Sequence, residues 1–172
     1  MALTDALQYI DEQRQTHIDQ LKDFVRIPSI SAGAEGETDR DLVRAADFLV
    51  DQFDQLGFGV EKVQVNADTN PLVLARSPDF SPQRPTVLVY GHYDVQGVDN
   101  PRSAWDVDPF AAEERDGFLV ARGASDNKGP SFAHLKAAEA ILAVGDQLPV
   151  NLVFLIEGEE ECGSRAIGQF VA

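Results

Sequence analysis

Residues 86–94 read Thr-Val-Leu-Val-Tyr-Gly-His-Tyr-Asp, a continuous apolar run that ends in a histidine and an aspartate. Such a run is typical of a strand buried on both faces, as in the parallel sheets of α/β proteins. A second apolar run, 150–156, is followed by three adjacent acids at 159–161. Helical patterns separate the strand-like segments. The sequence therefore predicts an α/β fold with a largely parallel sheet flanked by helices.

The remaining elements follow from apolar periodicity. Residues 3–26 have helical spacing, which Arg14 interrupts and Pro28 ends. A second helix is expected from an N-cap at Thr38 to a C-terminal stop at Gly57. Further strands are expected at 59–65, 72–75 and 118–121, and further helices at 129–144 and from about Ser164. We find no internal repeat and no pattern of a domain linker, so the chain is expected to form one domain or part of one.

Composition excludes several classes of protein. The 172 residues are 44% hydrophobic and 25% charged, which is the profile of a globular domain with one sizeable core. Acidic residues outnumber basic ones 29 to 14, and the net charge is −15. This charge argues against a nucleic-acid backbone or an anionic membrane surface as a partner. We expect most of the excess acid to lie on a solvated surface. A high-salt habitat is an alternative that no other feature supports.

Compartment signals point to the cytoplasm. The N-terminus lacks the basic leader and apolar core of a secretory signal, and no apolar run approaches the roughly 20 residues that a membrane helix needs. Cys162, the single cysteine, cannot form an internal disulfide, which fits a reducing compartment. Cys162 could bind zinc, but a small buried thiol is the favoured interpretation.

Three clusters carry residues with metal-binding chemistry: 91–94 with His92 and Asp94, 123–129 with Asp126, and 157–164 with Glu160 and Glu161. In open α/β sheets, ligands bind beyond the carboxyl ends of strands, so the first and third clusters should meet at one edge. Imidazole and carboxylate groups are ligands that zinc accepts. The spacing around Asp126 fits neither the phosphate-binding loop nor the dinucleotide fingerprint.

Each cluster also has a plain explanation. A His-x-Asp pair at a strand end is a common accident, an Asp-Asn-Lys-Gly run is an ordinary turn before a helix, and adjacent glutamates often form a solvated charge run. If the clusters form a site, His92 could present one ring nitrogen to a metal while Asp94 holds the other. Adjacent glutamates that point different ways could supply one metal ligand and one general base.

Taken together, the motifs resemble a known family. They are Tyr-Gly-His-Tyr-Asp-Val-Gln at 90–96, Trp105 with Asp-Pro-Phe at 108–110, Arg-Asp-Gly at 115–117, the run 122–130, the run 157–161 with Gly-Ser at 163–164, and the opening Phe-Val-Arg-Ile-Pro-Ser-Ile-Ser at 24–31. In this order they resemble the dinuclear-zinc metallopeptidase family that includes carnosinase, cytosolic nonspecific dipeptidase, carboxypeptidase G, and the acetylornithine and succinyl-diaminopimelate deacylases. The chain is most similar to the dipeptidase branch.

The resemblance implies a role for each candidate residue. His92 would bind one zinc ion, Asp126 would bridge two, and Glu161 would bind the other. Glu160 would be the general base, Asp94 would orient His92, and the peptide bond after Asp126 would be cis. The sequence departs from the family pattern at Gly97, Ala121, Asn127 and Cys162, where proline, glycine, aspartate and serine are usual. None of these departures removes a ligand.

The implied activity is hydrolysis of a peptide or related amide bond by water that two divalent ions activate. Zinc is expected, and manganese and cobalt accept the same ligands. The implied substrate is a small peptide and the full-length protein would be a homodimer. A dipeptidase is the expected activity, and an acyl-amino-acid deacylase of the same family is the alternative.

The length of the chain limits this expectation, because the family uses five ligands and three are present. Residues 1–172 are therefore interpreted as the N-terminal portion of a metallopeptidase catalytic domain, without the lid/dimerisation domain and the C-terminal part. For this chain we expect weak or no metal binding, no peptidase activity, and an exposed hydrophobic sheet edge. A truncated, non-catalytic remnant that acts as a binding module is the alternative. A nucleotide-binding domain is disfavoured by the charge and the missing phosphate loop.

Overall fold

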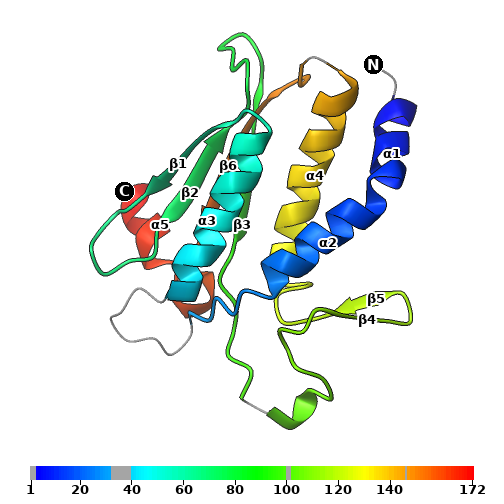
Figure 1. Ribbon diagram of the computed structural model, residues 1–172. Coiled ribbons are helices and arrows are strands. Elements are labelled where there is room, and N and C mark those ends of the chain that lie inside the picture. Colours follow the sequence, from blue (N-terminus) through cyan, green and yellow to red (C-terminus); the bar gives the residue numbers. More distant parts are fainter. Residues whose placement is uncertain (1–2, 32–39, 100–101, 146) are drawn as a thin grey trace.

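The computed structural model describes residues 3–31, 40–99, 102–145 and 147–172. No helix in these ranges is both long and apolar enough to cross a membrane. The elements, drawn in Figure 1, are α1 (Leu3–Glu12), α2 (Arg14–Val25), α3 (Arg40–Gln55), β1 (Gly59–Val63), β2 (Leu72–Arg76), β3 (Thr86–His92), η1 (Arg102–Ala104), β4 (Glu113–Arg115), β5 (Phe118–Val120), α4 (Lys128–Val144), β6 (Asn151–Glu157), η2 (Glu160–Cys162) and α5 (Arg165–Phe170).

Within the described ranges, the main sheet has four strands in the order β1-β2-β6-β3, and β4 and β5 form a separate hairpin. The α/β class is therefore confirmed, but the sheet is mixed rather than largely parallel. Strands β3 and β6 are parallel, whereas β1 pairs with β2 and β2 pairs with β6 in antiparallel fashion. The difference follows from the connections. A loop without a helix joins β1 to β2 and permits an antiparallel return, whereas the path from β3 to β6 includes α4, the helical crossover that a parallel pair needs.

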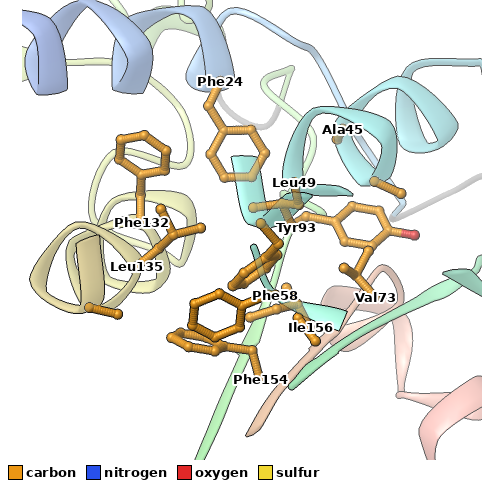
Figure 2. Packing of buried hydrophobic residues seen from close by; sticks show 14 of the residues in the cluster. Phe24, Ala45, Leu49, Phe58, Val73, Tyr93, Phe132, Leu135, Phe154 and Ile156 are labelled. Atoms are coloured by element: carbon orange, nitrogen blue, oxygen red, sulfur yellow. The ribbon is translucent and has the colours of Figure 1, made fainter. Parts of the chain in front are cut away.

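The core lies between the sheet and helices α2, α3 and α4 (Figure 1). Alternate residues of the central strand β6 face opposite sides, so Phe154 points into this core while Leu155 packs with a smaller cluster that includes Ala166 of α5. Figure 2 shows part of this core, with Phe58 next to Phe154. The ring centroids of Phe53 and Phe154 are 4.9 Å apart, and those of Phe58 and Phe154 are 5.9 Å apart. These contacts fix β6, the strand that leads into the acidic cluster.

The helix boundaries agree with the local signals. The predicted first helix is interrupted at Gln13, next to Arg14, and its second part ends at Val25, three residues before Pro28. Gly57 follows α3 with φ +74°, a left-handed conformation that suits glycine after a helix. The predicted N-cap at Thr38 lies outside the described residues. Strand β4 was not predicted, because three residues rich in charge carry no alternating apolar pattern.

The apolar run at 86–90 is not buried on both faces, which corrects the prediction from its composition. Among the described residues, β3 pairs with β6 alone and forms one edge of the sheet. A strand with one neighbour has its other edge open to solvent. Accordingly, the exposed fractions are 46% for Val87, 60% for Leu88 and 51% for Tyr90. The expectation of an exposed hydrophobic sheet edge is confirmed.

Truncating Leu88 tests whether this edge is uncovered in solution. In the 172-residue chain, Leu88→Ala is expected to change the free energy of unfolding by no more than about 0.5 kcal/mol, because the side chain is already largely in water. The same substitution at Leu155, which is buried on the neighbouring strand, should cost about 2–5 kcal/mol. Urea denaturation of both variants makes the comparison. A loss at Leu88 as large as that at Leu155 would mean that the edge is covered.

Candidate metal centre

Strands β3 and β6 bring the histidine cluster and the acidic cluster to the same end of the sheet. In their parallel register, His92, the last residue of β3, pairs with Glu157, the last residue of β6. Directly beyond this pair, the backbone N–H of Tyr93 donates to the Glu157 carbonyl at 2.8 Å. The two loops therefore begin side by side, as their positions after strands predicted.

His92 lies at the centre of the candidate site. Its Nε2 is 3.1 Å from Oδ1 of Asp126 and 3.7 Å from Oε2 of Glu160. His92, Glu160 and Glu161 each offer a ligand atom within 4.8 Å of the other two. The donors are thus one imidazole and several carboxylates, a set that fits zinc and related divalent ions. All four residues are among those that the sequence singled out.

Asp94 contacts two parts of the site at once. This fully buried carboxylate has Oδ1 3.3 Å from Nδ1 of His92, and its two oxygens accept the backbone N–H groups of Glu160 (3.3 Å) and Glu161 (3.1 Å). Nδ1 of His92 also lies 3.0 Å from the main-chain oxygen of Asp94. Because that oxygen can only accept, Nδ1 carries a hydrogen. When the ring is neutral, the lone pair of Nε2 is therefore left for a metal.

The three adjacent glutamates have different environments. Glu159 is buried and accepts the N–H groups of Asn70 (3.1 Å) and Ala166 (2.8 Å), so it caps α5 and ties down a neighbouring loop. Glu160 is a residue of η2 whose side chain is 43% exposed near Nε2 of His92. Glu161 is half-buried, and Nε2 of Gln96 donates to its Oε2 at 3.0 Å. The structure therefore assigns a packing role to the first acid and leaves the next two to the site.

The loop with Asp126 approaches the end of β3 closely. The Asp126 side chain is 75% exposed, and its peptide bond to Asn127 is cis, as the family resemblance implies. Oδ1 of Asn127 accepts from the backbone N–H of His92 at 3.4 Å. Gly91 permits this approach, because a Cβ there would overlap Oγ of Ser131 and crowd Oδ1 of Asn127.

Sequence reasoning assigned no role to two buried charged residues near the site. Lys128 follows the Asp126 loop and donates from Nζ to the carbonyls of Phe24 (3.1 Å) and Ile27 (2.7 Å). A lysine in the first turn of a helix opposes the helix dipole, and that local conflict was an available signal. Glu157 accepts from Tyr90 Oη at 2.6 Å, and burial raises its pKa. Its other oxygen has no hydrogen-bond partner in the described part of the chain.

Cys162 corrects one prediction. The thiol was expected to be buried, but the residue is exposed in η2. The local sequence, with acids before it and glycine after it, does not distinguish a turn that faces the core from one that faces solvent. Cys162 therefore does not act as a small core residue.

The pKa of His92 makes the metal-free chain sensitive to pH. Burial lowers this pKa, but the hydrogen bond and the negative charge of Asp94 outweigh it and raise the pKa from 6.5 to about 9. The folded state thus binds the proton more tightly than the unfolded state. The stabilisation that this bound proton gives the folded state is complete below pH 6.5 and is lost as the pH rises through about 9. A metal competes with the same proton, so metal affinity should increase over this window.

We therefore expect the free energy of unfolding of the metal-free chain to fall more steeply between pH 6.5 and 9 than that of His92→Gln. Urea denaturation at several pH values, in the presence of a chelator, measures both slopes. Equal slopes for the two proteins would contradict the raised pKa.

The fold and the donor set together define the class: an α/β domain with a candidate metal centre beyond its strand ends. The model of peptidase family M20/M25/M40 matches residues 88–172. Beta-Ala-His dipeptidase of Rattus norvegicus is 35% identical over 178 residues, covering 98% of this chain and 36% of its own length. Cys-Gly metallodipeptidase dug1 of Schizosaccharomyces pombe is 33% identical over 180 residues, covering 99% of this chain and 37% of its own length.

Solved structures give the same result. The crystal structure of human carnosine dipeptidase 1 superposes with a TM-score of 0.89 at 36% identity, covering 99% of this chain and 37% of that one. The di-peptidase Dug1p from Saccharomyces cerevisiae gives a TM-score of 0.85 at 31% identity, and the match covers 99% of this chain and 37% of that one. The chain belongs to peptidase family M20/M25/M40, and these relatives are dipeptidases. It spans little more than a third of their length.

Proposed function

We propose that the protein is a metal-dependent dipeptidase of which residues 1–172 form the N-terminal part of the catalytic domain. The observation that carries the proposal is the convergence of His92, Asp126, Glu160 and Glu161 at the shared end of β3 and β6. Metal-dependent dipeptidases among the relatives support it. The further expectations of a homodimer and a cytoplasmic location belong to this proposal.

Within the proposal, His92, Asp126 and Glu161 would hold two divalent ions, and zinc is the expected metal. When bound, such ions polarise a scissile carbonyl and lower the pKa of water. Glu160 takes the proton from the attacking water and delivers it to the leaving amine. Its exposure supports this role, because a general base must reach both water and substrate. Asp94 keeps the ring of His92 in the orientation that directs Nε2 toward Asp126.

The proposed substrates are dipeptides with free termini, of the kinds that the relatives' names describe: β-Ala-His and Cys-Gly. A deacylase is the second candidate, because succinyl-diaminopimelate desuccinylase of Bordetella pertussis is 34% identical over 144 residues, covering 84% of this chain and 34% of its own length. Both reactions hydrolyse an amide bond and need the same activated water. Hydrolysis of both dipeptides and of N-succinyl-diaminopimelate by a protein of the relatives' length, with and without a chelator, tests the proposal. Activity that survives removal of metal would contradict it.

The isolated chain tests the domain assignment. With three of the expected five ligands, we predict less than one tightly bound zinc per 172-residue chain after dialysis, measured by elemental analysis. His92→Ala is the control for adventitious zinc, since it removes the imidazole ligand. Two zinc ions per chain that are lost in His92→Ala would show that the five-ligand interpretation is wrong. The coding sequence after Ala172 separates an enzyme from a binding remnant: further ligands favour the enzyme, and a stop codon favours the remnant.

A further inference from the structure

The short segment after α2, residues 27–31, lies against the loop that carries Asp94. Ile30 and Val95 form an isolated parallel bridge, the N–H of Val95 donates to the Ser29 carbonyl at 2.9 Å, and the N–H of Ser31 donates to the Val95 carbonyl at 3.3 Å. The segment thus runs beside this loop like one more short strand. It is far from the site in sequence but adjacent to it in space.

Ser31 extends this contact into the site. Its side chain is buried, and its Oγ donates to Oδ2 of Asp94. Oδ2 is the oxygen that also accepts the N–H of Glu161. One hydroxyl therefore touches the carboxylate that holds both the His92 ring and the turn that carries Glu160 and Glu161.

The geometry indicates what this hydroxyl does. An ionised carboxylate has about four acceptor positions. Among the described residues, four donors face Asp94: the His92 ring, two backbone N–H groups and Ser31 Oγ. The terminal torsion of an aspartate has broad minima, so the rotation of its carboxylate is set by its partners rather than by the side chain itself. Without Ser31, Oδ2 would keep one donor among the described residues, the N–H of Glu161. The carboxylate could then rotate and hold η2 less firmly.

We propose that Ser31 is a positioning residue. Its hydroxyl fixes the rotation of the Asp94 carboxylate, so that the same group holds the His92 ring on one side and the Glu160–Glu161 turn on the other. The spacing of the ligand and base side chains thus depends on a residue that lies 63 positions before Asp94 in the sequence. The consequence for catalysis rests on the proposed function, but the structural effect does not.

Hydrogen exchange of the 172-residue chain tests this proposal without any enzyme assay. In Ser31→Ala, the backbone N–H groups of Glu160 and Glu161 should exchange roughly tenfold faster, the loss expected when one net hydrogen bond of a network disappears. Ser29→Ala is the matched control. Ser29 is equally buried in the same segment, and its Oγ donates to the Tyr93 carbonyl at 2.6 Å instead of to Asp94. It should leave the two amides at their wild-type rates.

Two further variants keep the test decisive. Ser31→Thr retains the hydroxyl and should restore wild-type exchange. Ser31→Cys keeps the size of the side chain but is a weak donor, so it should accelerate both amides and replaces the alanine variant if that one does not fold. Wild-type exchange at Glu160 and Glu161 in both Ser31→Ala and Ser31→Cys would overturn the proposal, as would equal acceleration by Ser29→Ala. If the extended protein were no dipeptidase, the exchange result would still stand.

Discussion

Replacing Glu160 with glutamine is expected to lower the turnover of a dipeptide by about 10²–10⁴-fold while the metal content stays unchanged. The substitution keeps the size of the side chain and its backbone N–H contact with Asp94, but glutamine cannot accept a proton at neutral pH. Glu160 is the acid whose exposed carboxylate lies 3.7 Å from His92 Nε2, where water on a metal would be within reach. Turnover is measured in a form of the protein that has the length of its relatives.

The two neighbouring acids are matched controls for this prediction, because each has a different environment. Glu161→Gln should reduce metal content together with turnover, since Glu161 is the proposed ligand. Glu159→Gln should instead lower the free energy of unfolding, because its carboxylate holds the N–H groups of Asn70 and Ala166 in a buried position. Metal analysis and urea denaturation distinguish the three effects. Wild-type turnover in Glu160→Gln would remove this residue from the role of general base.

The largest expected effect on stability is at Phe154. Phe154→Ala should cost about 3–5 kcal/mol of unfolding free energy. The ring is fully buried in the central strand and packs against Phe53 and against Phe58, which Figure 2 shows beside it. The loss combines the transfer of an aromatic ring with the cavity that remains. Because β6 continues into η2, a loosened strand also displaces the acidic cluster.

The control for Phe154 is the same substitution at Phe118, which is 73% exposed in the β4–β5 hairpin. Phe118→Ala should change stability by about 0.5 kcal/mol or less. Denaturant titration of both variants, followed by circular dichroism, measures the difference. Similar losses at the two positions would show that the aromatic cluster is not the centre of the core.

Most elements of the fold were predictable because their signals are local. Apolar periodicity predicts the strand β6 and the helix α4. Residues with special backbone angles predict that α3 ends before Gly57 and that α2 ends before Pro28. The pairing of strands was less predictable. An apolar run such as 86–90 indicates a strand but does not say how many neighbours it has, and β3 proved to be an exposed edge. The antiparallel partners of β2 were missed for the same reason.

The candidate site was predictable as a set of residues and not as an arrangement. His92, Asp126, Glu160 and Glu161 were recognisable from their residue types, their places after strands and the family resemblance. The roles of Ser31 and Lys128 were not, because each acts across more than 60 residues of sequence through a hydrogen bond that only folding creates. The three glutamates 159–161 look alike in the chain, and burial alone separates the α5 cap from the two acids of the site.

By itself the sequence determined the family, the α/β class and the chemistry of the donors, since motif order, apolar periodicity and residue type are properties of the chain before it folds. The tertiary structure decided the sheet pairing, the exposed edge at β3 and the assignment of each acid. It also decided that Asp94 serves His92 and η2 together. The physical reason is that hydrogen-bond partners and solvent exposure depend on which distant segments meet, and packing of the whole domain selects those segments.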